Sequence, residues 1–158
     1  MHPIVAVERL QLWRASSTDL EGLLEIDRKC FSRPWSRQMF LEELTGKRKH
    51  LYVAARLEQG KLSPLLGFIC FHCCLDEATL IRIAVDPGCR QQGTAALLMR
   101  KMFARLKQEK IREIFLEVST VNHAALALYQ SFDFHRIGSR PTYYAGSGED
   151  ALLMKAVL

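Results

Sequence analysis

The sequence predicts an α/β (α+β) fold, with a mixed, mostly antiparallel central sheet and helices on both faces. Residues Thr79–Val85 carry apolar side chains on both faces, which is typical of a central strand. Apolar residues at helical spacing from Ala95 to Leu106 then form one stripe of a helix. A further strand follows at Glu113–Val118, and a helical crossover favours parallel pairing with the first strand.

Three strands are expected before Thr79. The first is Leu10–Arg14, and the other two, Leu51–Leu57 and Leu65–Leu75, form a hairpin across Glu58–Lys61. Their alternating apolar residues and the glycine between them predict this pairing. Together with Thr79–Val85, these strands are expected to form the antiparallel part of the sheet.

Two helices are expected between the first two strands. A capping box at Thr18–Glu21 starts a helix with a mixed face that ends near Cys30. Ser36 caps a second helix, which ends at Gly46. Lys47–His50 is expected to be a solvated basic loop.

The C-terminal part is expected to contain one helix and two strands. The helix runs from Asn122 to Phe132, and the strands are Phe134–Tyr143 and Ala151–Val157. A loop that contains Gly146–Gly148 joins these strands. The sequence has no repeat and no low-complexity linker, so we expect one domain over residues 1–158.

Composition limits the class of protein. The chain has 158 residues, of which 49% are hydrophobic and 25% charged, as in ordinary globular proteins. No apolar leader follows Met1–Ile4, and the most apolar run, Leu65–Phe71, is too short to cross a membrane. We therefore expect a soluble cytoplasmic protein. The net charge of +5 comes with no visible nucleic-acid module.

The five cysteines are expected to be free thiols, because the count is odd and no secretion signal is seen. Cys70–Cys74 also contains a histidine, which suggests a metal site. The alternation of a strand would place these ligands on two faces, and no second ligand cluster is present. Buried strand thiols are the favoured interpretation, and no metal is expected.

The loop after Val85 is a candidate anion site. Asp86–Gly88 stops the strand, and the small residues of Arg90–Ala95 lead into the helix. Free backbone N–H groups and the positive end of the helix dipole favour a pyrophosphate there. By itself this pattern is also that of an ordinary strand-to-helix connection.

A resemblance to a known family makes the interpretation of this loop more specific. Val85–Pro87 followed by Arg90–Ala95 resembles the acetyl-CoA motif Q/R-x-x-G-x-G/A of the GNAT acetyltransferases. Four further segments resemble the RimI-type branch of that family: Leu75–Leu80, Ile83–Val85, Leu116–Val118 and Ala127–Tyr129. The resemblance implies a GNAT fold, acetyl-CoA as co-substrate, and acetylation of the N-terminal alanine of a small-subunit ribosomal protein.

The resemblance also implies which residues bind acetyl-CoA. The backbone of the Thr79 strand is expected to polarise the thioester carbonyl, and the loop to bind the pyrophosphate. The residues are Ile83, Ala84, Val85, Gln91, Gln92, Gly93, Thr94, Ala95, Ala96 and Asn122. From its position alone, Asn122 is equally read as a helix cap.

The resemblance implies Glu117 as general base and Tyr129 as general acid. Glu117 would take a proton from the amine, and Tyr129 would give one to the leaving CoA thiolate. Without the resemblance, Glu117 reads as an exposed strand-end carboxylate and Tyr129 as a core tyrosine.

The acceptor groove is implied at Trp35, Tyr143 and Tyr144, for which packing is the plain alternative. The chain departs from the family pattern at several positions. Arg82 stands where a smaller polar residue is common, and Ser119 replaces an arginine. These two departures bear on acceptor specificity more than on catalysis.

Two alternative functions stay open at this stage. One is acetylation of another protein N-terminus or of a small-molecule amine. The other is a non-catalytic acyl-CoA-binding or ribosome-associated module, against which the presence of both Glu117 and Tyr129 counts.

Overall fold

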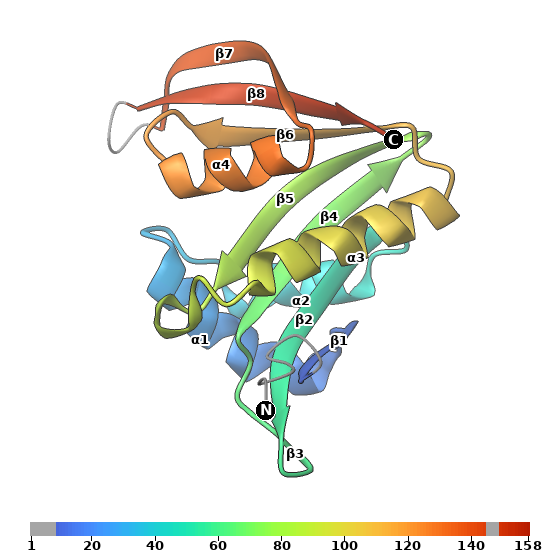
Figure 1. The fold of residues 1–158 in the computed structure, drawn as a ribbon, viewed down its shortest axis with the longest axis vertical. Helices are drawn as coiled ribbons and strands as arrows, with labels where there is room; N and C mark the ends of the chain where they lie inside the picture. Colours follow the sequence, from blue (N-terminus) through green and yellow to red (C-terminus); the bar gives the residue numbers. More distant parts are fainter. Residues whose placement is uncertain (1–8, 145–148) are drawn as a thin grey trace, which may run out of the picture. The chain divides into compact units, whose positions relative to one another are not determined.

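The computed structural model describes residues 9–144 and 149–158 (Figure 1). Met1–Ile4 and the Gly146–Gly148 loop lie outside the described residues. The helices and strands are β1 (Leu10–Arg14), the 3-10 turn Ser17–Asp19, α1 (Leu20–Cys30), α2 (Arg37–Thr45), β2 (Lys49–Glu58), β3 (Lys61–Leu62), β4 (Gly67–Cys74), β5 (Glu77–Val85), the 3-10 turn Pro87–Cys89, α3 (Thr94–Gln108), β6 (Glu113–Ser119), α4 (His123–Ser131), β7 (His135–Tyr144) and β8 (Glu149–Val157).

The strands pair in the order β1-β2-β4-β5-β6-β8-β7, and β3 pairs with β2. The chain divides into two compact units. The first comprises Met1–His72 and Ile81–Met102, and the second comprises Cys73–Leu80 and Phe103–Leu158. No helix of the described part of the chain is long and apolar enough to cross a membrane.

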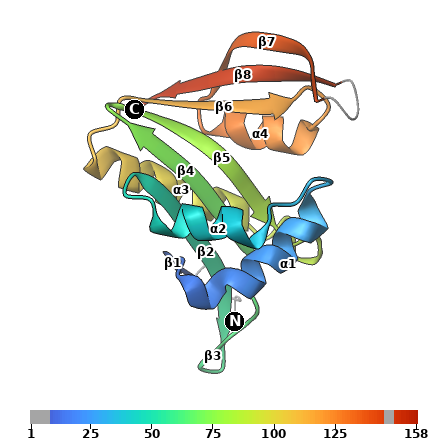
Figure 2. The same cartoon turned by 180° about the vertical axis from the view of Figure 1, so that it is seen from behind.

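The first unit is a sheet covered on both faces. β2 runs antiparallel to β1 and to β4, with Tyr52 opposite Ile69. Helices α1 and α2 lie on one face, where the rings of Phe40 and Phe68 are 5.7 Å apart (Figures 1 and 2). The first part of α3 lies on the other face, where the Lys101 ammonium is 5.3 Å from the Tyr52 ring.

The core beneath α1 and α2 explains why these segments form helices. Leu20, Leu23 and Leu24 recur at helical spacing and are buried, so α1 places an apolar stripe on the sheet. Ser36 caps α2 by accepting a hydrogen bond from the Met39 N–H at 3.2 Å. The helix then stops at Gly46, which is extended.

The second unit is built on β6. The start of β5 pairs with it in parallel, with Ala78 opposite Ile114, and β8 pairs with it antiparallel. Strand β7 completes this part of the sheet next to β8, with register shifts along the pair. α4 is fixed by aromatic packing, because the Tyr129 and Phe134 rings lie 5.8 Å apart.

The predicted helices and strands are confirmed within one to three residues, with two local corrections. The predicted capping box at Thr18–Glu21 is wrong: the box is formed two residues earlier, where the Asp19 carboxylate accepts from the Ser16 N–H at 2.9 Å. The predicted solvated loop Lys47–His50 is also wrong for its last two residues. Lys49 and His50 belong to β2, and His50 is buried. The predicted hairpin is present, with β3 as an additional short strand.

Candidate functional site

The loop after β5 is held in a defined shape by its own backbone. Asp86 accepts a hydrogen bond from the Gly88 N–H at 2.9 Å, which closes the turn after the strand. Gln91 and Gly93 both have positive φ, 62° and 80°. Left-handed residues in such a loop turn successive N–H groups toward one side, which is the arrangement of an anion-binding nest. α3 begins immediately afterwards, at Thr94.

Two observations indicate that this loop has open space beside its backbone and a buried polar group that lacks a hydrogen-bond partner. A side-chain carbon at Gly93 would meet no atom within 4 Å. The Thr94 hydroxyl is 1% exposed and has no hydrogen-bond partner among the described residues. A buried hydroxyl without a partner is costly, and a ligand phosphate or its bridging water would relieve that cost. The loop therefore fits a phosphorylated ligand.

The other residues expected to bind acetyl-CoA in the first unit lie beside this loop. Ala84 and Val85 are buried at the end of β5, while Ile83 is partly exposed. The Gln92 side chain accepts a hydrogen bond from Arg56. Ala95 and Ala96 lie in the first turn of α3, where backbone N–H groups lack partners within the helix.

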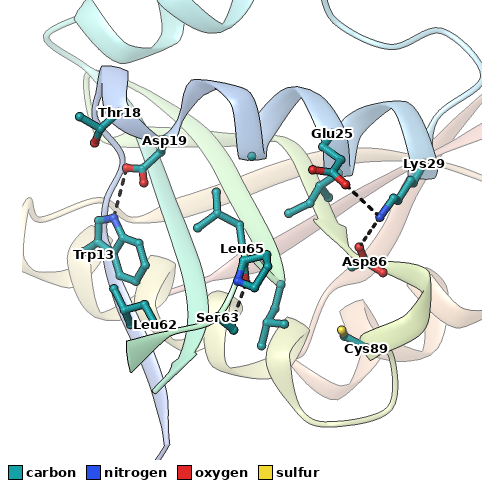
Figure 3. Close-up of a pocket in the computed structure, with 14 residues that line it drawn as sticks. Trp13, Thr18, Asp19, Glu25, Lys29, Leu62, Ser63, Leu65, Asp86 and Cys89 are labelled. Carbon is teal, nitrogen blue, oxygen red and sulfur yellow. Dashed lines mark hydrogen bonds and ion pairs between the residues drawn. The ribbon is translucent and has the colours of Figure 1, made fainter. Parts of the chain in front are cut away.

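A cavity of about 560 Å³ lies in the first unit between α1 and the segment before β4 (Figure 3). Lys29 closes one side, with its ammonium 3.1 Å from Asp86 and 3.4 Å from Glu25. The hydrogen bond from Gly88, helped by Lys29, lowers the pKa of Asp86, and Asp86 in turn raises the pKa of Lys29. None of the expected site residues lines this cavity.

Glu117 lies in β6 of the second unit. Its neighbours Leu116 and Val118 are buried on one face, while Glu117 is on the other, as the alternation predicts. Its carboxylate oxygen is 3.3 Å from the Arg140 guanidinium. The same strand holds a similar pair, in which Lys155 is 3.3 Å from Glu113. Glu117 thus keeps solvent access together with a cationic neighbour.

The two other predicted site residues of the second unit belong to α4. Asn122 caps the helix by accepting from the Ala125 N–H at 3.1 Å, so the capping role is confirmed. Tyr129 is 7% exposed, and its ring packs against Phe134. The loop residues belong to the first unit, and Glu117, Asn122 and Tyr129 belong to the second, so the predicted site residues are divided between the two units.

Trp35 lies in the connection between α1 and α2. Its ring packs edge-on against Phe40, with centroids 5.1 Å apart, and it stands beside the Arg82 guanidinium. Tyr143 and Tyr144 are the last residues of β7, and their side chains lie outside what the structure describes.

The cysteines of β4 divide between two faces, as the alternation predicts. On one face, the Cys70 thiol donates to Glu43 at 3.4 Å, and His72 lies 2.6 Å from the same carboxylate. On the other face, the Cys73 thiol donates to Glu109 at 3.6 Å. Burial raises the pKa of Cys70 well above its usual value, so this side chain stays a neutral thiol.

The sequence matches the acetyltransferase (GNAT) family over residues 20–134. The chain belongs to this family. The match spans parts of both compact units.

Similar proteins carry a more specific name. Ribosomal protein bS18-alanine N-acetyltransferase from Escherichia coli K12 is 35% identical over 87% of this chain and 90% of that protein. The Salmonella typhimurium enzyme of the same name is 33% identical over 88% and 91%. The crystal structure of the Escherichia coli ribosomal-protein-S18-alanine N-acetyltransferase matches with a TM-score of 0.83 and 30% identity, over 94% and 93% of the chains. Arabidopsis thaliana NAA60, crystallised with acetyl-CoA, shares the fold with a TM-score of 0.83 at 18% identity.

The sequence interpretation missed two contacts near the predicted site. It did not foresee the pairing of Arg140 with Glu117, because nothing in the spacing of β6 and β7 links these positions. It singled out Arg82 but did not connect it with Asp27. A signal for Asp27 was present: it continues the apolar stripe of Leu20, Leu23 and Leu24, and a carboxylate on a buried stripe requires a partner.

Proposed function

We propose that this protein transfers the acetyl group of acetyl-CoA to the N-terminal alanine of ribosomal protein bS18. The observation that carries the proposal is the identity of 33–35% with bacterial enzymes of that name, over about nine-tenths of both chains. The acetyl donor is acetyl-CoA, which supplies an acetyl group activated as a thioester. A cytoplasmic location is part of the proposal, because ribosomal proteins are made and assembled there.

The first unit would hold the donor. Backbone N–H groups from Gln91 to Ala96 face an anion favourably at the N-terminus of α3, so they would bind the pyrophosphate. The Thr94 hydroxyl, buried without a partner among the described residues, would complete this set. Backbone groups of Ile83–Val85 would polarise the thioester carbonyl. Asn122, which belongs to the second unit, would be a further contact, although its amide oxygen is used as a helix cap.

The second unit would supply the proton transfers. An N-terminal amine has a pKa of about 7.7–8.0 and is mainly protonated at neutral pH. Glu117 would take its proton, directly or through water, and the neutral amine would attack the thioester. Arg140, whose guanidinium lies 3.3 Å from the Glu117 carboxylate, would orient it for that task. Tyr129 would donate its phenol proton to the leaving thiolate. Trp35, Tyr143 and Tyr144 are proposed to line the acceptor groove.

The decisive experiment uses acetyl-CoA and a panel of short peptides that differ in their first residues, with products identified by mass. Acetylation of alanine-first peptides is expected in the parent. Glu117→Gln should reduce turnover by about 10²–10⁴-fold, because it keeps the shape and loses the base. The loss should shrink at high pH, where the amine is already neutral.

Glu113→Gln is the matched control, because Glu113 lies in the same strand and has a similar ion pair at the same distance. It should leave turnover near the parent value. Preferred acetylation of another first residue would assign a different acceptor. Acetyl-CoA binding without any turnover in the parent would instead support a binding module.

A further inference from the structure

A buried ion pair joins α1 to β5 in the first unit. Asp27 is fully buried, and one of its oxygens lies 2.8 Å from the Arg82 guanidinium, whose side chain is 17% exposed. The other oxygen accepts a hydrogen bond from the Trp35 N–H at 2.6 Å. The carboxylate thus connects the last turns of α1, the segment that follows it and the central strand.

The same guanidinium also stacks on the aromatic side chains of this segment. It lies 3.9 Å from the centre of the Phe31 ring and 4.5 Å from that of Trp35. A guanidinium over an aromatic ring is attracted to it, more strongly when water is excluded. Arg82 therefore contacts both ends of the connection between α1 and α2, residues 31–36, which we call the acceptor loop.

Two further contacts join the last turn of α1, just before the acceptor loop, to the end of β5 and the residue after it. The Cys30 thiol donates to the Val85 carbonyl oxygen at 3.3 Å. The Lys29 ammonium lies 3.1 Å from the Asp86 carboxylate. These contacts hold the last turn of α1 against the strand, while Arg82, together with the Asp27 carboxylate, holds residues 31–36.

We propose that Arg82 is a positioning residue that sets the acceptor loop, and through Trp35 the selectivity for the first residues of the acceptor. This inference rests on the proposed function. The Asp27–Arg82 pair is neutral as a whole, so it presents the acceptor with fixed aromatic rings rather than with a net charge. A loop that is displaced by a small distance misaligns the amine, which is enough to reduce catalysis strongly.

The first test measures the exposure of Trp35, in the acceptor loop, in the protein without substrates. The chain has two tryptophans, so Trp13→Phe leaves Trp35 as the only indole. In that background, acrylamide quenching of Trp35 should increase in Arg82→Gln and less in Arg82→Lys, which keeps the charge but loses the flat guanidinium. Arg37→Gln is the control, because it removes an exposed ion pair with Glu21 in the same two helices.

The second test measures kinetics on the peptide panel. Arg82→Gln should raise the KM for the alanine-first peptide by about tenfold to a hundredfold, while the KM for acetyl-CoA stays close to that of the parent. The ratio of kcat/KM between alanine-first and serine-first peptides should fall. The double variant Asp27→Asn with Arg82→Gln removes both charges. It should regain thermal stability relative to Arg82→Gln and still show the raised acceptor KM.

Recovery of the acceptor KM and of the selectivity in the double variant would reduce the pair to a stabilising role and overturn the inference. Unchanged Trp35 quenching in Arg82→Gln would overturn it as well. A parent that acetylates no peptide would contradict the proposed function and the acceptor role together. In that case the quenching result would still decide whether Arg82 anchors the loop.

Discussion

At the scale of single residues, the two proposed proton-transfer groups have different surroundings. Glu117 is exposed and lies beside Arg140, so water or a substrate amine can reach its carboxylate. Tyr129 is buried and packed against Phe134, which suits a group that acts only once the ligand is bound. Water can therefore reach the proposed base, whereas the proposed acid is shielded from water.

Tyr129→Phe tests the acid. It keeps the ring and its packing, so the fold should be retained, but the phenol proton is lost. Turnover should fall by about 10²-fold or more, and, unlike the loss in Glu117→Gln, this loss should persist at high pH. A pH–rate series on both variants and the parent gives the comparison.

Tyr52→Phe is the matched control, because Tyr52 is a second buried tyrosine, packed on Phe71, outside the proposed site. If both tyrosine variants lose the same small fraction of activity at every pH, the role of Tyr129 is packing.

At the scale of elements, the strand-to-helix connection at the end of β5 carries the donor site. Its shape depends on left-handed backbone at Gln91 and Gly93. Such conformations cost little for glycine and roughly 1–2 kcal/mol for other residues. A strained non-glycine residue at this point fits a loop selected to direct its N–H groups.

Gly93→Ala separates backbone strain from ligand binding. Gly93 and Gly60, in the β2–β3 turn, have similar positive φ, 80° and 76°, and neither has an atom within 4 Å of an added side-chain carbon. Alanine at either position should lower the free energy of unfolding by roughly 1–2 kcal/mol. Only Gly93→Ala should weaken acetyl-CoA binding, measured by calorimetry, and the bulkier Gly93→Val should weaken it further. Equal affinities in the Gly93 and Gly60 variants would place the pyrophosphate elsewhere.

The elements themselves could be predicted because their signals are local. The caps at Ser36 and Asn122 and the alternation in β6 depend only on neighbouring residues. The start of β2 at Lys49 was missed because the basic run Lys47–His50 suggests a loop, whereas tertiary packing buries His50 against Phe71. The pairs Asp27–Arg82 and Glu117–Arg140 join distant parts of the chain, which no local pattern encodes.

At the scale of the whole molecule, the described structure contains five free cysteines in very different surroundings. Cys74 is exposed, whereas Cys70 and Cys73 are buried. Burial raises the pKa of Cys70 and Cys30, which lowers their thiolate fraction at neutral pH. The molecule should therefore react with thiol reagents at one position well before the others.

Titration of the denatured, unreduced protein should detect all of the cysteines as free thiols. In the native protein, Cys74 should react first, because it is exposed, and Cys70 last, because it is buried and its raised pKa lowers its thiolate fraction. Mass spectrometry after timed labelling gives this order, and Cys74→Ser should remove the fast phase. Detection of fewer thiols than cysteines would reveal a disulfide and contradict the prediction.

The first unit is discontinuous in sequence, and this has a consequence for how the chain is made. Its core contains Leu23, Phe40 and Ala84. Ala84 follows the segment Cys73–Leu80, which belongs to the second unit. A nascent chain that has emerged only as far as His72 lacks β5 and α3, and thus one wall of that core and the cation that neutralises Asp27. The apolar side chains of this core therefore stay exposed until Met102 has left the ribosomal exit tunnel. During that interval the growing polypeptide is most exposed to chaperones and to aggregation.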